Sequence, residues 1–400
     1  MDVLPNEEEQ MLRTAVRDFL EAECPTSLVR EMEKDDLGYP PELWEKMAEL
    51  EWLGMSLPEE HGGQGLPLTY LGILLEEVGR FLAPVPLHST TSAAMTIARH
   101  GSDAQKQEIL PAVARGELIM TFAFQEADPR ISPIAVKAEA TEGGEHLVLN
   151  GTKMFVDNFN VANKCIVVCR TEPGSTGGNG LSLLVVDTDS DGITQIPLIP
   201  TAKDKQSKVI FENVRVPREN LIGPLHEGWP IAEAMLDLAT ALLCAQMVGA
   251  ARKDAEIAIE YSKGRTAFGR PIGAFQSIQH LCADMIIWVD GGQLLTFEAL
   301  WAMDNGRPAS VEVSQAKAHC NEKCQAIVRS CQTIHGGIGF MMEFDIHLWY
   351  RRVASWSMRL GTTFEHRARV ARALLDQPGR VRLGEPLMAV PEPAPGGTPA

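Results

Sequence analysis

Residues 261–285 read YSKGRTAFGRPIGAFQSIQHLCADM, and they join two segments of helical periodicity through a turn that contains Gly and Pro. Arg265 and Arg270 flank the TAFG tetrapeptide in this turn. A guanidinium can hold a pyrophosphate through two parallel hydrogen bonds, and the ring of Phe268 can pack on an adenine or ribose face. The same residues also suit a solvated cation and a core aromatic, so the stretch by itself leaves both interpretations open.

The segments around this turn predict a bundle of long helices. Apolar residues recur three and four positions apart over 229–263, 275–303, 308–334 and 345–374, and helices of these lengths suit antiparallel packing. Most of the first 118 residues show the same helical pattern. Between the two helical regions, short β-branched runs such as CIVVCRT and LSLLVVDT alternate with turns rich in Gly, Pro and Asp, which predicts strands.

We therefore expect an α+β multidomain fold. Its parts are an N-terminal α-helical domain (1–118), a middle β-domain (119–225), a C-terminal four-helix bundle (226–377) and a tail (378–400). The tail is rich in Pro, Gly and Ala, a composition typical of disorder.

Composition narrows the class of protein. The formal net charge of −17 argues against a nucleic-acid-binding protein, because proteins bind nucleic acid mainly with Lys and Arg. It does not exclude binding of a phosphate-bearing cofactor, which needs only a few local cations. No unbroken apolar run reaches the length of about 18 residues that spans a bilayer. The acidic first residues lack the pattern of a secretory signal. We expect no membrane segment.

The eight cysteines do not form a metal-binding pattern. CIVVC (165–169) and CNEKC (320–324) each lack a second pair or a suitably spaced His to complete four ligands. Free buried thiols are the better interpretation, and reduced thiols favour a cytoplasmic protein.

Three further stretches belong with the opening one: LPEEHGGQGLPLTYLGILLEEVGR (57–80), VIFENVRVPRENLIG (209–223) and IHGGIGF (334–340). In this order of helices, strands and helices, they resemble the acyl-CoA dehydrogenase family over roughly residues 5–375. The resemblance implies FAD as cofactor and desaturation of an acyl-CoA thioester, in which a Glu removes the α-proton and flavin N5 takes the β-hydride. It also implies that one subunit holds the flavin ring while its neighbour holds the ADP end.

The residues of the ADP-end motif are largely kept. They match the family pattern R..FG......Q and its Gly pair, except that Thr333 stands where the family has a Gln. With the Thr of the later GT motif and the His beside the Gly pair, the cofactor-binding residues implied by the resemblance are Arg265, Phe268, Gln276, Thr333, His335, Gly336, Gly337 and Thr362. For the His, a cofactor role and a packing role both remain open.

The residues of the flavin-ring motif are largely lost. The family's TEPGAGSD loop corresponds to FQEADPRISP (124–133), in which Gln125 replaces the Thr and nothing matches GSD. The family's WIT corresponds to FVD (155–157), and Phe364 replaces a Gln that contacts the cofactor. A carboxylate about 4 Å from a reduced flavin would oppose its negative charge by roughly 4 kcal/mol at an effective dielectric near 20.

The catalytic base is absent at both positions that the family uses. The family's YEGT corresponds to RLGT, which places Leu360 at the position of the Glu, and the alternative position on an earlier helix holds Ala239. Neither side chain can accept a proton. The carboxylates nearby in sequence, Asp237, Glu233 and Glu343, are expected to be solvated or paired.

The losses therefore fall on one half of the site and the retained residues on the other. This division, and the run IHGGIGFMMEFDIHLWYRR (334–352), resemble bacterial α2β2 acyl-CoA dehydrogenases of steroid catabolism, in which one subunit type carries the base. The run also suits a charged helix start that packs the bundle. We expect a non-catalytic subunit that completes the FAD site of a related catalytic subunit and shares its acyl-CoA substrate. The alternatives are a homo-oligomeric enzyme with a displaced base and a flavin-free acyl-CoA-binding or scaffold homologue.

Overall fold

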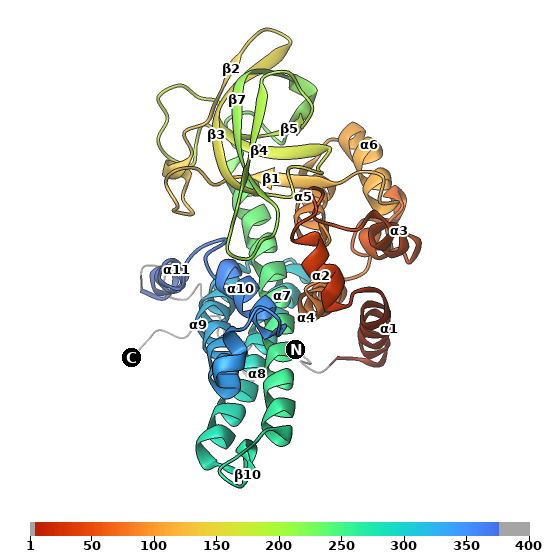
Figure 1. Cartoon of the computed structure of the whole chain (residues 1–400). Helices are drawn as coiled ribbons and strands as arrows, with labels where there is room; N and C mark the ends of the chain where they lie inside the picture. Colours follow the sequence, from red (N-terminus) through yellow and green to blue (C-terminus); the bar gives the residue numbers. More distant parts are fainter. Residues whose placement is uncertain (1–4, 376–400) are drawn as a thin grey trace, which may run out of the picture.

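The computed structural model describes residues 5–375, so the tail predicted over 378–400 lies outside the described residues. Figure 1 shows three parts that follow one another along the chain: a group of helices, a twisted sheet and a long helical bundle. The sheet lies at one end of the molecule and the tip of the bundle at the other. This arrangement confirms the expected α+β fold.

The N-terminal part contains α1 (Glu7–Glu23), α2 (Thr26–Met32), α3 (Pro41–Glu49), α4 (Leu68–Phe81), α5 (Leu87–His100) and α6 (Asp103–Ala114). A capping box starts α1, because the side chain of Asn6 accepts a hydrogen bond from the Glu9 amide and the Glu9 carboxylate accepts one from the Asn6 amide. Ser102 and Gln105 start α6 in the same way.

The middle part is a sheet of eight strands: β1 (Met120–Ala123), β2 (Glu139–Glu142), β3 (His146–Asp157), β4 (Lys164–Arg170), β5 (Leu181–Asp187), β6 (Ile193–Leu198), β7 (Gln206–Pro217) and β8 (Leu221–Ile222). The order is β6-β7-β3-β2-β4-β5-β8, with β1 added in parallel to β4. Cys165 and Cys169 lie on one face of β4, as their spacing predicts. All eight cysteines lie in the described part of the chain as free thiols, and all but Cys282 are buried.

The C-terminal part contains α7 (Trp229–Gly264), α8 (Gln276–Asp304), α9 (Ser310–His335), α10 (Ile346–Trp356) and α11 (Thr363–Leu375). A short hairpin of β9 (Thr266–Ala267) and β10 (Arg270–Pro271) joins α7 to α8 at the tip of the bundle. One helix in the described residues, α7, is long and apolar enough to cross a membrane by length and composition, but 94% of that window is buried inside the protein.

The single helix predicted over 345–374 is wrong, because a turn separates α10 from α11. Leu360 and Gly361 both have positive φ, 52° and 95°, which a right-handed helix excludes. The turn is held by two hydrogen bonds: the His366 ring donates from Nε2 to the Leu360 carbonyl over 2.8 Å, and the Asn321 amide donates to the Gly361 carbonyl over 3.0 Å. This turn carries the RLGT motif.

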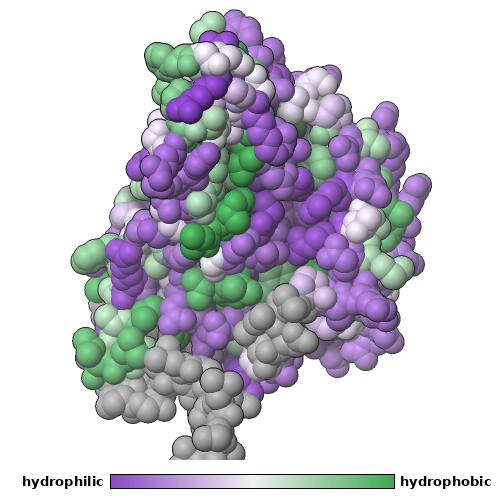
Figure 2. Space-filling model, turned by 90° about the horizontal axis from the view of Figure 1, so that it is seen from below, coloured by the Kyte–Doolittle hydropathy of each residue, from purple (hydrophilic) through white to green (hydrophobic). Residues whose placement is uncertain are grey.

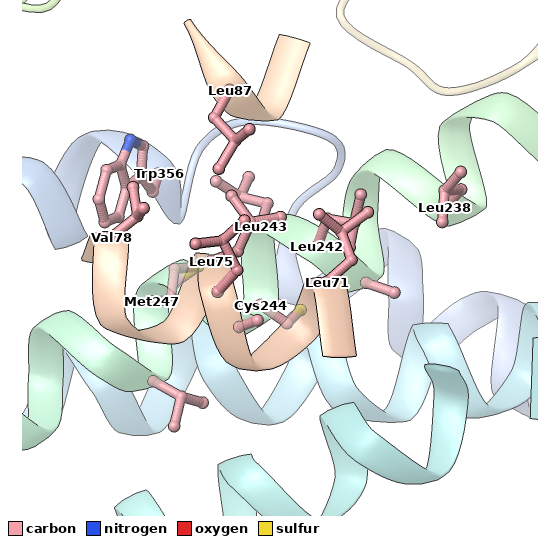
Figure 3. Packing of buried hydrophobic residues seen from close by; sticks show 14 of the residues in the cluster. Leu71, Leu75, Val78, Leu87, Leu238, Leu242, Leu243, Cys244, Met247 and Trp356 are labelled. Atoms are coloured by element: carbon pink, nitrogen blue, oxygen red, sulfur yellow. The ribbon is translucent and has the colours of Figure 1, made fainter. Parts of the chain in front are cut away.

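The N-terminal helices join the bundle through apolar and charged contacts. Leu71 and Leu75 of α4 pack against Leu242 and Leu243 of α7 (Figure 3). Among the charged contacts, Arg30 of α2 pairs with Asp345 at the start of α10 at 2.6 Å, and Arg351 of α10 pairs with Glu33 at the end of α2 at 2.7 Å. The charges in 334–352 therefore include contacts that pack the bundle.

Close approach of α4 and α7 depends on glycine. A Cβ atom at Gly249 would lie 1.8 Å from the Glu76 carbonyl oxygen on α4, closer than any real contact. We expect Gly249→Ala to lower the free energy of unfolding by about 1–3 kcal/mol, because the two helices must separate. Gly264→Ala on the same helix is the control, since nothing lies within 4 Å of its Cβ position. Urea unfolding of both variants checks this, and equal stability of the two would contradict it.

Candidate functional site

Two adjoining cavities lie where the sheet, α5, α7 and the turn between α10 and α11 meet. Their volumes are about 60 and 50 Å³. Both are lined by His88, Asp157, Leu243 and Arg359. Four of the positions at which the sequence predicts loss of the flavin-ring motif or the base line the smaller cavity: Gln125, Phe155, Asp157 and Leu360.

Arg359 joins two carboxylates across the junction. Its Nη1 lies 3.0 Å from the Asp157 carboxylate at the end of β3, and its Nη2 pairs with Asp204 in the loop before β7. Gln206 donates a further hydrogen bond to Asp157 over 2.9 Å. Burial raises the pKa of Asp157, with the Arg359 charge opposing the rise. Burial also acts to raise the pKa of Asp204, but Arg359 and Arg352 outweigh it and the pKa is lowered.

Leu360 and Ala239, the two positions that the family resemblance gives to the base, supply no carboxylate. Leu360 lines the smaller cavity beside Leu236. Ala239 is fully buried, and its carbonyl accepts a hydrogen bond of 2.8 Å from Nε2 of His88. Burial lowers the pKa of His88 to about 4, so this ring is neutral at pH 7. The one carboxylate among the residues lining the smaller cavity is Asp157, which Arg359 already pairs.

A buried ion pair fixes the loop that replaces TEPGAGSD. Nζ of Lys153, which is fully buried, lies 2.7 Å from the Glu126 carboxylate. The same carboxylate accepts the backbone amides of Lys137 and Ala138, so its charge is well satisfied. Above this pair, Gln125 and Phe155 line the smaller cavity, and Phe155 has a φ of 55°.

The residues at this junction do not fit a flavin ring. Pockets that hold cofactor-sized ligands usually enclose about 300–1,000 Å³, several times the volume of either cavity. Arg359 and Asp157 line both cavities, so widening the cavities to that volume would break a half-buried ion-pair cluster. The ring-binding half of the site is therefore closed in this chain.

The ADP-end residues of the hairpin lie at the tip of the bundle. Arg265 ends α7, Phe268 has 94% of its surface exposed, and Gln276 begins α8 and is exposed. Phe268 has a φ of 53° and meets Phe275 edge-on, with ring centroids 6.0 Å apart. Nothing in the described chain covers the aromatic face that the sequence assigns to an adenine.

The Gly pair follows α9 and is equally open. No atom lies within 4 Å of a Cβ position at Gly336 or Gly337, and Gly336 has a φ of 60° with a ψ of −135°. His335 is buried and stacks on Tyr261 of α7, with centroids 4.2 Å apart. This contact favours a packing role for the His, because it links the Gly pair to the helix that ends at Arg265. Thr333 is exposed, and its hydroxyl donates to the Arg329 carbonyl.

Thr362 lies apart from these residues, in the turn between α10 and α11. Its hydroxyl and amide both donate to the Glu365 carboxylate over 2.9 Å, so it starts α11. Phe364 follows it and is 82% exposed. The face seen from below in Figure 2 carries patches of apolar residues among hydrophilic ones.

The three carboxylates that the sequence leaves as solvated or paired are so in the structure. Asp237 and Glu233 both pair with Arg369 of α11, at 2.9 and 3.5 Å, and Glu343 is exposed. Sequence reasoning missed Arg359 as the group that closes the ring pocket. The signal was present in RLGT, where an Arg occupies the position of the Tyr in YEGT.

Comparison with known proteins agrees with this geometry. Three family models match in order: "Acyl-CoA dehydrogenase, N-terminal domain" over residues 6–117, "middle domain" over 121–214 and "C-terminal domain" over 226–375. The caffeyl-CoA reductase–Etf complex subunit CarC of Acetobacterium woodii is 30% identical over 367 residues, which are 90% of this chain and 96% of that protein.

Two solved structures are also similar. The Tcur3481–Tcur3483 steroid ACAD variant has a TM-score of 0.84 and 30% identity, covering 92% of this chain and 98% of that one. The ChsE4–ChsE5 complex from Mycobacterium tuberculosis has a TM-score of 0.87 and 25% identity, covering 94% and 100%. FAD is the cofactor of these relatives' family, whose members are oxidoreductases acting on CH–CH bonds. The chain belongs to the acyl-CoA dehydrogenase family.

Proposed function

We propose that this chain is the non-catalytic subunit of a heteromeric acyl-CoA dehydrogenase. It completes the FAD site of a related subunit that carries the base, and the complex desaturates an acyl-CoA thioester. The observation that carries the proposal is the contrast between the two half-sites. Arg359 and its carboxylates occupy the junction at which the ring motif is lost, while the residues kept from the ADP-end motif, such as Phe268, are exposed.

The positions of the two halves support a role toward another chain. The hairpin with Arg265 and Phe268 lies at the tip of the bundle, remote from the junction beneath the sheet (Figure 1). The hairpin of one chain therefore cannot reach that chain's own junction. Arg265, Phe268, Gln276, Gly336 and Gly337 would hold the ADP end of an FAD whose ring lies in the partner.

The names of the relatives support an assembly with a second subunit. CarC is described as a subunit of a complex with Etf, and ChsE4–ChsE5 is described as a complex. A steroid substrate is supported by the name of the Tcur3481–Tcur3483 protein. We extend these features to this chain as part of the proposal.

The expected result for the chain purified alone is an absorbance spectrum without a flavin band, because the ring half is closed. Co-expression with a related subunit that has TEPGAGSD and the Glu should give a yellow complex with one FAD for every two chains. The measurement is FAD released by denaturation, counted against protein. One FAD per chain in the isolated protein would contradict the proposal and favour a homo-oligomeric enzyme.

The alternative of a flavin-free scaffold or acyl-CoA-binding protein gives a different outcome. Such a chain would stay colourless with every co-expressed relative. The scaffold alternative predicts no change in a partner's FAD content when Phe268 or Arg265 is replaced. The proposed function predicts that FAD leaves the complex.

A further inference from the structure

The larger junction cavity is lined by a buried arginine that forms no ion pair in the part of the chain that the structure describes. Arg352 lies on α10, and only 8% of its surface is exposed. Its Nε has no hydrogen-bond partner, and the guanidinium forms no ion pair within residues 5–375. Burial lowers the pKa of Arg352, but a guanidinium remains protonated in proteins. The carboxylates of Asp204 and Glu33 act on this charge without forming an ion pair with it, so the Nε–H of Arg352 remains free to donate to an anion.

The nearest carboxylates are already used by other arginines. Asp204 and Glu33 are the two acidic groups that act on the charge of Arg352. Asp204 pairs with Arg359, and Glu33 pairs with Arg351 at 2.7 Å. Neither carboxylate forms an ion pair with Arg352 within the described residues, although Oδ1 of Asp204 is itself buried without a hydrogen-bond partner.

The cavity has an excess of positive charge. Four cations line it, Lys203, Lys205, Arg352 and Arg359, together with two carboxylates, Asp157 and Asp204. His88 also lines it and is neutral. The stem of Lys205 crosses Gly38, where a Cβ would lie 2.3 Å from the lysine Cγ. Because Gly38 has no side chain, the Lys205 side chain has room to reach the cavity.

The volume of about 60 Å³ admits a few waters or one small oxyanion. A guanidinium matches a carboxylate or phosphate group because two of its N–H groups can donate in parallel. The neighbouring cavity shares four lining residues with this one and is lined largely by apolar side chains, including Phe122, Met154 and Leu236. It can receive the apolar body of a molecule whose anionic end lies on Arg352.

We propose that this cavity is an anion-binding site, in which Arg352 binds a carboxylate or phosphate group with Lys203 and Lys205 at its rim. The site stands apart from the proposed function, because it requires neither a partner subunit nor FAD. The anion would be a ligand that this chain binds in place of a flavin ring.

The probes are inorganic phosphate, acetate and hexanoate, each titrated into the full chain by calorimetry at ionic strength held constant with KCl. We expect saturable binding of at least one probe. Tighter binding of hexanoate than of acetate assigns the site to a carboxylate with an apolar body, and tightest binding of phosphate assigns it to a free phosphate. Absence of saturable binding for all three overturns the proposal.

Arg352→Gln should weaken binding at least tenfold. Arg367→Gln is the control, because Arg367 pairs with Glu322 at the surface and does not line the cavity. Unchanged binding by Arg352→Gln refutes the assignment.

Thermal unfolding without added anion gives a readout that does not depend on binding. Arg352→Gln should unfold at a temperature close to that of the native chain, since it breaks no ion pair within the described residues. Arg351→Gln should unfold at a lower temperature, because it breaks the ion pair with Glu33. Should either core variant fail to fold, Lys205→Gln at its half-buried position tests the same site and should also weaken binding.

Discussion

Arg359→Met should lower the free energy of unfolding by about 3–5 kcal/mol at pH 7, the largest stability effect we expect from a single side chain in this protein. The guanidinium joins the turn between α10 and α11 to Asp157 at the end of β3 and to Asp204 before β7. Without it, two carboxylates of the same sign remain side by side in a poorly solvated junction. Urea unfolding followed by circular dichroism measures the loss.

The pH dependence tests the cause of that loss. Asp204 has a lowered pKa in the folded chain, so its stabilising contribution is present above its ordinary pKa near 3.8 and is lost as the pH falls through the lowered value. In Arg359→Met, burial without the cation favours protonated carboxyls. The difference in stability between the native chain and the variant should therefore begin to shrink above the ordinary pKa near 3.8, as the variant's carboxyls take up protons, and keep shrinking as the pH falls through the lowered pKa of Asp204 in the native chain.

The control is Arg367→Met, because Arg367 pairs with Glu322 at the surface, where an ion pair is worth at most about 1 kcal/mol. Adding Asp157→Asn to Arg359→Met should recover part of the loss, since one unpaired carboxylate is then removed. A loss of under 1 kcal/mol for Arg359→Met, equal to the control, would show that the cluster does not close the junction.

The fold followed from periodicity and from motifs at fixed spacing. Helical patterns around residues 229–335 and alternation in the middle region place α7, α8, α9 and the sheet correctly, because each element buries a local stripe or face. The break between α10 and α11 was missed, although Gly361 marks it. A helical pattern continues through the break, and only long-range hydrogen bonds from Asn321 and His366 show that the chain turns there.

The site was predictable where it depends on single positions. The motifs single out Leu360, which lines the smaller cavity, and the hairpin, whose Phe268 is exposed. The ion-pair cluster was not predictable, because Arg359, Asp157 and Asp204 come from three segments far apart in sequence. That Arg352 forms no ion pair was also not predictable, because it depends on the pairing of Glu33 with Arg351 and of Asp204 with Arg359. Charges in a sequence do not show their pairing.

Arg265→Ala should weaken FAD retention by roughly ten- to a hundredfold in the complex with a catalytic partner. A charge-assisted hydrogen bond to a pyrophosphate is worth about 1.5–3 kcal/mol, which converts to that range. The lowered affinity is expected for the FAD site whose flavin-ring pocket and catalytic base belong to the partner subunit. Arg265 is exposed in this chain, so the replacement should leave the unfolding temperature of the isolated chain unchanged. Equilibrium dialysis of the complex, with FAD fluorescence as the readout, measures the dissociation constant.

Arg270→Ala is the matched control, because Arg270 lies in the same hairpin and is equally exposed but falls outside the R..FG......Q pattern. Its guanidinium lies 4.2 Å from the centroid of the Phe275 ring, so it has a local role on this chain. Retention of FAD by Arg270→Ala and its loss from Arg265→Ala would locate the ADP end on this chain's hairpin. Equal affinity in both variants would mean that the hairpin does not reach the partner's FAD. The motif at the tip of the bundle would then serve packing alone. That result would favour the flavin-free scaffold over a subunit that completes the FAD site of a partner.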